Sequence, residues 1–369
     1  MKSSTITSRR NFMKGLAIGG AGLTLPHIST GSIGRDVEMN ISEKLPRLPL
    51  KIALTSGLGP DFLKSLGSIS NQISIIEPDN ENARMSAAKD SDVWLGYIRK
   101  EEFSAAKNLK WIHSTSAGVE GYLFPELINS DVQLTNAKGC YGPAIGEHTI
   151  GLLLALTRNI ASKAQSMKNN DWSGGGNDNM VEMKNWTVGI IGFGGIGKQV
   201  ARRARGMDMR IVAMDIVPMY KEQIGDICDE IYLFHDNGLD KLLKQSDVIV
   251  SAAPHTQDTE GMFGEEQFNQ MRKGSYFINV SRGKLVKTDE LMNALTSGHL
   301  AGAGLDVTDP EPLPSDHRLW SIPNVIITPH ISGRSQHSYN RVQEVFVDNV
   351  KRFVNGFPLL NLVDKIAGF

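Results

Sequence analysis

A glycine-rich turn between an apolar strand and a helix is the feature that most restricts the fold of this 369-residue chain. Residues 188–191, Val-Gly-Ile-Ile, form a short apolar run typical of a buried strand. Residues 192–197, Gly-Phe-Gly-Gly-Ile-Gly, follow directly, and residues 197–205 have a helical pattern. A strand, a G-x-G-x-x-G turn and a helix in this order predict a βαβ unit whose turn binds a pyrophosphate.

Each glycine of this turn has a physical role in the prediction. The first permits the tight turn, the second lets backbone N–H groups approach the pyrophosphate, and the third lets helix and strand pack closely. The anion then lies at the helix N-terminus, where free N–H groups and the helix dipole stabilise it. We therefore expect cofactor contacts from Gly192, Gly194, Gly195, Ile196 and Gly197.

An acidic residue, Asp215, ends the next apolar run, about 20 residues beyond the turn. A carboxylate at this place hydrogen-bonds a ribose 2′-hydroxyl and repels the extra phosphate of NADP, so the sequence favours NAD as the cofactor. The alternative is that Asp215 is an ordinary turn residue at the end of a strand.

Short apolar runs alternate with helical patterns on both sides of the turn. Before it, the strand-like runs are residues 51–55, 73–76, 92–97 and 109–114. After residues 187–191, they are residues 211–215, 247–251, 276–280, 302–307 and 325–328. This alternation predicts an α/β fold with two Rossmann-like or flavodoxin-like domains, each built on a doubly wound parallel sheet.

Two amphipathic or apolar helices suggest how these domains are connected. Residues 144–160 have apolar side chains at helical spacing and would link the domains. Residues 338–354 have one apolar stripe and could pack back on the first domain. We expect an NAD-binding Rossmann domain at residues 150–330, and a discontinuous substrate domain formed by residues 50–143 and 335–365.

Residues 1–45 are expected to be a signal peptide and linker. Residues 8–14, Ser-Arg-Arg-Asn-Phe-Met-Lys, resemble the twin-arginine export signal. The apolar stretch at residues 16–25 is shorter than the about 20 residues that span a bilayer, so no stable membrane anchor is expected. The expected location is the periplasm, reached by a chain that has already folded around its cofactor. The alternative is a cytoplasmic protein with an uncleaved extension.

Composition argues against several classes of partner. The formal net charge is −1, without the basic excess of a nucleic-acid-binding protein. The two cysteines, Cys140 and Cys228, cannot form a disulfide framework, and no His, Asp or Glu cluster indicates a metal site. We expect a small-molecule substrate, no nucleic acid and no metal.

Three ordered segments of the second half are more specific. They read Ile-Asn-Val-Ser-Arg-Gly at residues 278–283, Gly-Leu-Asp-Val-Thr-Asp-Pro-Glu-Pro-Leu-Pro at residues 304–314, and Asn-Val-Ile-Ile-Thr-Pro-His-Ile-Ser-Gly at residues 324–333. In this order and spacing they resemble the D-isomer-specific 2-hydroxyacid dehydrogenase family. The resemblance extends from about residue 50 to the end of the chain, and it implies hydride transfer between NAD(H) and a 2-hydroxy or 2-keto acid.

The resemblance implies that Arg282, Glu311 and His330 form the catalytic set. Reduction of a 2-keto acid adds hydride to the carbonyl carbon and a proton to its oxygen, and His330 would donate that proton or accept it in the reverse direction. Glu311 would hold the other ring nitrogen and favour the protonated ring. Arg282 would bind the substrate carboxylate and polarise the carbonyl.

The resemblance also implies contacts outside this set. A loop with a glycine suited to close backbone approach would bind the substrate carboxylate through Ala117, Gly118 and Val119. The further cofactor contacts would be Pro254, Thr259, Val280, Ser281, Asp306 and His330. Members of the family commonly pair through their cofactor domains, so we expect a homodimer.

Two other classes of function remain open at this stage, a non-catalytic NAD-bound regulator of the same fold and a flavodoxin-like signalling module. The complete Arg–Glu–His set favours the enzyme, because a protein that only binds has no need of a proton donor. Adjacent helical residues point in different directions, so Glu147 and His148 are expected to be structural rather than an acid–base pair. Glyoxylate, hydroxypyruvate and larger 2-keto acids are all open as substrates.

Overall fold

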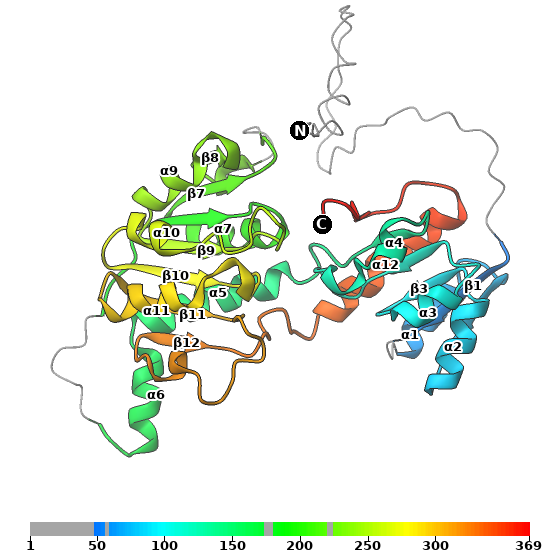
Figure 1. The fold of residues 1–369 in the computed structure, drawn as a ribbon, viewed down its shortest axis with the longest axis horizontal. Coiled ribbons are helices and arrows are strands. Elements are labelled where there is room, and N and C mark those ends of the chain that lie inside the picture. Colours follow the sequence, from blue (N-terminus) through cyan, green and yellow to red (C-terminus); the bar gives the residue numbers. More distant parts are fainter. Residues whose placement is uncertain (1–47, 56–58, 173–179, 220–223) are drawn as a thin grey trace, which may run out of the picture. The chain divides into compact units, whose positions relative to one another are not determined.

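Two parallel β-sheets with covering helices form the described part of the chain in this computed structural model (Figure 1). The structure describes residues 48–55, 59–172, 180–219 and 224–369. The expected export signal lies outside these residues. Within them, no helix is both long enough and apolar enough to cross a membrane.

The first sheet has five parallel strands in the order β2-β1-β3-β4-β5. The strands are β1 (Leu50–Leu54), β2 (Ile73–Ile76), β3 (Val93–Leu95), β4 (Trp111–His113) and β5 (Gln133–Thr135). The helices are α1 (Pro60–Gly67), α2 (Glu81–Asp90), α3 (Lys100–Ala105) and α4 (Pro125–Ile128). Side chains of β1 alternate between two cores, with Ile52 packed beside α1 and Ala53 beside α2. This strand order is the flavodoxin-like one, and β5 is a strand that the sequence pattern did not predict.

The second sheet has seven parallel strands in the order β12-β11-β10-β9-β6-β7-β8. The strands are β6 (Thr187–Ile191), β7 (Arg210–Asp215), β8 (Glu230–Leu233), β9 (Val248–Ser251), β10 (Ser275–Asn279), β11 (Leu300–Leu305) and β12 (Val325–Ile327). The helices are α7 (Gly195–Arg205), α9 (Gly238–Gln245), α10 (Glu265–Gln270) and α11 (Thr288–Thr296). The doubly wound prediction is confirmed, with β8 as an unpredicted edge strand.

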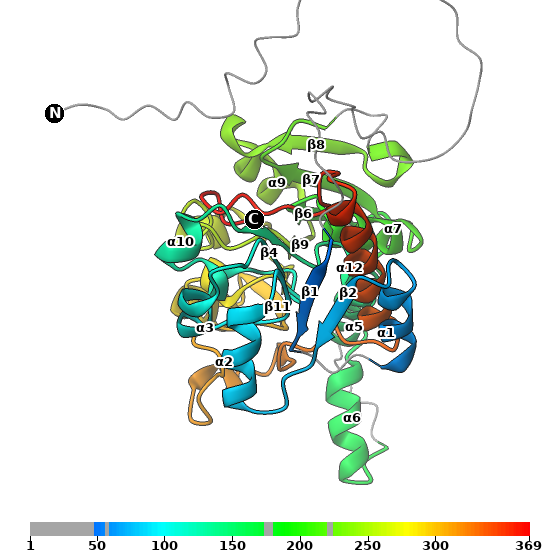
Figure 2. The ribbon, with the colours of Figure 1, turned by 90° about the vertical axis from the view of Figure 1, so that its right-hand side faces the viewer.

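The C-terminal helix α12 (Ser338–Val354) packs on the first sheet, as its apolar stripe predicts (Figure 2). Phe346 and Phe353 stack on Trp111 of β4, with ring centroids 5.2 and 5.5 Å apart. The tail continues along β5, where the Val363 N–H donates to the Leu134 carbonyl. Residues from the two ends of the described chain therefore share one core. The exact domain boundaries given above remain a prediction.

The single helix expected at residues 144–160 is two helices, α5 (Gly142–Thr157) and α6 (Ile160–Lys168). Asn159 between them has a left-handed φ of 54°, which a helix interior does not allow. The apolar face of α5 is buried, whereas no residue of α6 is buried. The break therefore separates a packed helix from an exposed one.

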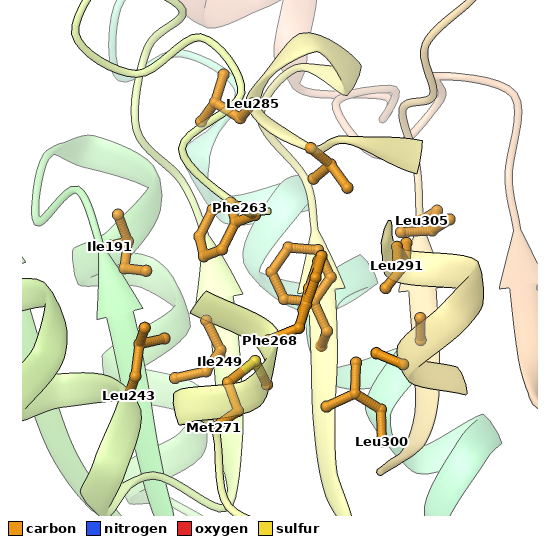
Figure 3. Close-up of a cluster of buried hydrophobic side chains, with 14 of the residues drawn as sticks. Ile191, Leu243, Ile249, Phe263, Phe268, Met271, Leu285, Leu291, Leu300 and Leu305 are labelled. Atoms are coloured by element: carbon orange, nitrogen blue, oxygen red, sulfur yellow. The ribbon is translucent and has the colours of Figure 1, made fainter. Parts of the chain in front are cut away.

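An aromatic cluster fixes one face of the second sheet (Figure 3). Phe263 and Phe268 pack edge-on against Phe277 of β10, at 4.8 and 5.5 Å between ring centroids. Leu285, in the segment that follows β10, and Leu291 of α11 belong to the same cluster. This packing holds the carboxyl ends of β10 and β11, from which the expected site residues follow.

Candidate active site

The expected catalytic and cofactor residues follow the carboxyl ends of parallel strands in the second sheet. The glycine turn follows β6, Arg282 follows β10, Asp306 follows β11 and His330 follows β12. Strand order reverses between β6 and β9, where doubly wound sheets bind their ligands. The sheet topology thus brings residues from distant parts of the sequence to one edge.

His330 and Glu311 form a direct acid–histidine pair, since Glu311 Oε1 lies 2.6 Å from His330 Nδ1. Their side chains are 46% and 41% exposed, so the pair is open to a ligand. His330 has a φ of 51°, and its backbone N–H donates to the Asp306 carbonyl at 2.8 Å. Because Nδ1 is held by the carboxylate, Nε2 is the nitrogen left to face a substrate.

The Asp306 carboxylate holds the loop that carries His330. Its Oδ1 accepts the Thr328 hydroxyl at 2.7 Å and the Ile331 N–H at 3.0 Å. Its Oδ2 accepts the Ser332 N–H at 3.0 Å, and the residue is 1% exposed. A buried carboxylate with three donors fixes the loop backbone. The cofactor contact expected of Asp306 remains a prediction.

The helix α5 adds a further support that the sequence did not reveal. His148 Nε2 lies 2.8 Å from the Thr328 hydroxyl, whereas Glu147 accepts a hydrogen bond from Arg203 at 2.9 Å. The two adjacent residues thus have different partners, in agreement with the expectation that they form no acid–base pair. His148 acts through Thr328 and Asp306 on the loop of His330.

Arg282 is positioned by contacts on both sides of its guanidinium. Its Nε donates to Glu120 Oε1 at 3.0 Å, and its Nη1 donates to the Ser281 carbonyl at 2.8 Å. The next residue, Gly283, is required because a Cβ there would lie 1.9 Å from the Thr308 carbonyl oxygen. The close approach brings the Arg282 segment against the loop that leads to Glu311.

The loop of Ala117, Gly118 and Val119 meets Arg282 directly. A Cβ on Gly118 would lie 1.7 Å from Arg282 Nη2, so only glycine leaves room for the guanidinium. Within the described residues, the backbone N–H groups of these three residues donate to no protein acceptor. The loop therefore offers free donors beside a cation, an arrangement suited to a carboxylate.

The glycine turn fits the pyrophosphate of a dinucleotide. A Cβ on Gly197 would lie 2.2 Å from the Gly192 carbonyl oxygen, so the close packing of helix on strand requires glycine. A Cβ on Gly194 would meet nothing within 4 Å, which leaves open space at the start of α7. Asp215 ends β7 and accepts the Phe193 N–H at 2.8 Å, so its carboxylate lies against the turn. The residues present therefore fit NAD.

The other expected cofactor residues lie along neighbouring strand ends. Val280 and Ser281 are buried, and the Ser281 hydroxyl is 2.8 Å from the Ser251 hydroxyl. The Thr259 hydroxyl donates to the Pro254 carbonyl at 2.7 Å and so closes the turn between them. These contacts shape the segments, and direct cofactor contacts by the four residues remain predictions.

Glu120 is the residue at this site that the sequence analysis missed. It directly follows the 117–119 loop, and this position was the only signal in the sequence. Its partner Arg282 is 162 residues away along the chain.

Comparisons with known proteins agree with this geometry. Residues 150–332 match the NAD-binding domain of D-isomer specific 2-hydroxyacid dehydrogenase. The chain is 34% identical over 295 residues to a glyoxylate reductase of Thermofilum pendens, covering 78% of this chain and 86% of that protein. It is 34% identical over 289 residues to a glycerate dehydrogenase of Methylorubrum extorquens, covering 76% of this chain and 87% of that protein.

Solved structures show the same similarity in the fold. A D-isomer specific 2-hydroxyacid dehydrogenase family protein from Aeromonas salmonicida has a TM-score of 0.74 and 30% sequence identity, covering 86% of this chain and 99% of that one.

Proposed function

This chain belongs to the D-isomer-specific 2-hydroxyacid dehydrogenase family, and we propose that Arg282, Glu311 and His330 carry its reaction. The family membership makes it an NAD-dependent oxidoreductase that interconverts a 2-hydroxy acid and a 2-keto acid. When bound at the glycine turn, NADH would supply the hydride for reduction and NAD⁺ would accept it in oxidation. The residues described above then bind the acid and move the proton.

Arg282 and the 117–119 loop bind the substrate carboxylate. The guanidinium offers Nη2, because Nε and Nη1 are already engaged with Glu120 and Ser281. The loop with free N–H groups lies directly beside this nitrogen, at Gly118. A carboxylate held between charged and neutral donors is oriented as well as bound, which sets the carbonyl carbon in a fixed position.

His330 transfers the proton at Nε2. In reduction, the imidazolium gives its Nε2 proton to the carbonyl oxygen as hydride arrives at carbon, and the neutral ring remains. In oxidation, neutral Nε2 takes the hydroxyl proton. Glu311 holds Nδ1 throughout, so that its negative charge stabilises the imidazolium.

The 2.6 Å contact between His330 and Glu311 is the observation that carries this proposal. We would follow NADH consumption by purified protein with a panel of 2-keto acids, and compare His330→Asn. Asparagine tolerates the positive φ at this position better than most residues, so the loop should keep its shape. The variant should lose at least about 100-fold in kcat while binding NADH as the wild type does.

A matched control is His337→Asn, at an exposed histidine just before α12. It should keep wild-type turnover. Unchanged turnover in His330→Asn would refute the assigned role. Bound NADH without turnover of any 2-keto acid would support the regulator instead.

We further propose a homodimer in which α6 contributes to the contact. The side chains of Ile160 and Met167 are 53% and 72% exposed, and Trp172 just beyond the helix is 99% exposed. Ile160 and Met167 are seven residues apart, which places them on the same face of the helix, and exposed apolar side chains of this size favour a protein partner. Light scattering should give a dimer mass for the wild type and a monomer mass for Ile160→Glu/Met167→Glu. Ile366→Glu, at a residue 92% exposed near the C-terminus, is the control that should remain dimeric.

We propose, from the sequence of residues 8–14, export to the periplasm by the twin-arginine route. Cell fractionation with Arg9→Lys/Arg10→Lys tests this proposal. The variant should accumulate in the cytoplasm with its N-terminus intact, whereas the wild type should be periplasmic and shortened. Cytoplasmic wild-type protein with residues 1–30 intact would refute the proposal.

A further inference from the structure

An anionic side chain stands at the place where the substrate is expected to bind. Glu120 begins a short 3₁₀ turn, Glu120–Tyr122, immediately after the 117–119 loop. Its Oε1 accepts the Arg282 Nε hydrogen bond at 3.0 Å, and its Oε2 lies 2.6 Å from the position of a Cβ on Gly118. The carboxylate thus touches both elements that would hold the substrate.

The charges at this point are nearly balanced before a substrate arrives. Glu120 is 40% exposed and Arg282 is 33% exposed, and within the described residues Arg282 is the only cation in an ion pair with Glu120. A bound 2-keto acid adds its C1 carboxylate to the same guanidinium. Arg282 then serves two carboxylates, and a third anion beside them is repelled by both.

The neighbouring side chains favour an uncharged group. The Tyr97 ring, 53% exposed, lies within 3.4 Å of the Cβ position of Gly121, the residue after Glu120. It packs edge-on against Tyr122, with ring centroids 5.4 Å apart. Such a ring pair offers apolar contact to an aliphatic substrate chain, and its phenol groups carry no positive charge to balance a second anion.

We propose that Glu120 is a specificity-determining residue that restricts the enzyme to 2-keto acids with an uncharged side chain. The proposal rests on the proposed function, since it assumes that the substrate carboxylate binds at Arg282. A second carboxylate or a phosphate on the substrate is rejected by repulsion from Glu120. Specificity of this kind comes from a repulsive group as well as from attractive contacts.

The test compares two acids that differ mainly in one charge, 2-oxovalerate and 2-oxoglutarate, which share a five-carbon chain. We would measure kcat/KM for both with the wild type, Glu120→Gln and Glu120→Asp. In Glu120→Gln, which keeps the size but removes the charge, the kcat/KM for 2-oxoglutarate divided by that for 2-oxovalerate should rise about tenfold. It should stay near the wild-type ratio in Glu120→Asp.

Glu126→Gln is the matched control, because Glu126 is an acid of the next helix, α4, paired with Lys100 and not with Arg282. It should leave the ratio unchanged. If Glu120→Gln changes kcat/KM by the same factor for both acids, the proposal is overturned, because Glu120 would then only restrain Arg282. A wild type that already prefers 2-oxoglutarate would also overturn it.

Binding of both acids to the NADH complex, followed by the fluorescence of NADH, separates this proposal from the proposed function. The affinity ratio should shift about tenfold in Glu120→Gln even if no variant turns over. If the affinity ratio shifts in Glu120→Gln but the wild type turns over no 2-keto acid, the dehydrogenase activity is refuted and the role of Glu120 is kept. Turnover with an unchanged ratio would refute the role of Glu120 alone.

Discussion

Glu311 Oε1 lies 2.6 Å from His330 Nδ1, and each residue is fixed in place by a different set of contacts. The loop of Glu311 is tied down by the Thr288 hydroxyl, which donates to the Asp309 carbonyl at 2.8 Å. The loop of His330 is held by the buried Asp306 carboxylate. Since neither loop depends on the acid–histidine contact itself, the pair is preorganised for proton transfer.

Replacing Glu311 by Gln should lower kcat for 2-keto acid reduction by about 10- to 100-fold. Glutamine can still accept a hydrogen bond from Nδ1, but it carries no charge to stabilise the imidazolium. Steady-state kinetics checks kcat, and an NADH titration should give an unchanged Kd. Wild-type kcat in this variant would contradict the role assigned to Glu311.

Replacing Thr328 by Val should reduce kcat by about tenfold through a shift of the His330 loop. The change removes the hydroxyl that donates to Asp306 and contacts His148, at little change in volume. Thr328→Ser keeps the hydroxyl and should restore kcat, a rescue that a purely steric role would not produce. KM should change less than kcat in Thr328→Val, because Arg282 still binds the carboxylate.

Replacing Asp215 by Asn should raise the preference for NADPH over NADH by at least about tenfold in kcat/KM. The amide oxygen can still accept the Phe193 N–H, so the glycine turn keeps its shape. The charge that repels a 2′-phosphate is lost. If the kcat/KM for NADPH divided by that for NADH is unchanged in Asp215→Asn, Asp215 is only a turn residue.

Stability should depend on pH through His113, which is fully buried at the end of β4. Burial lowers the pKa of this imidazole to about 3, from 6.5. The unfolded chain therefore takes up a proton below pH 6.5 that the folded chain does not, so stability falls from pH 6.5 toward pH 3. In His113→Phe, the loss of unfolding free energy between pH 8 and pH 5 should shrink by about 2 kcal/mol.

Urea denaturation at both pH values measures this difference. An exposed histidine, His337, provides the control variant His337→Phe, which should keep the wild-type pH dependence. If His113→Phe loses as much unfolding free energy between pH 8 and pH 5 as the wild type does, burial of His113 is not the cause of the pH dependence.

The alternation of apolar runs and helical patterns predicted most of both sheets, because the periodicity of a buried strand or helix is a local property. The edge strands β5 and β8 were missed. β5 has three residues, and β8 has an exposed first residue and three half-buried ones, so neither shows a long apolar run. The break at Asn159 was also missed, since an asparagine in a helical pattern does not reveal a left-handed φ.

The sequence by itself determined the two parallel-sheet domains, the glycine turn and the identity of Arg282, Glu311 and His330 as candidates, since these depend on short segments in a fixed order. Only the tertiary structure decided which side chains meet. Glu120 and Arg282 are separated by 162 residues, and His148 and Thr328 by 180. Contacts over such separations arise from strand order and helix packing across the whole chain, and no local pattern carries that information.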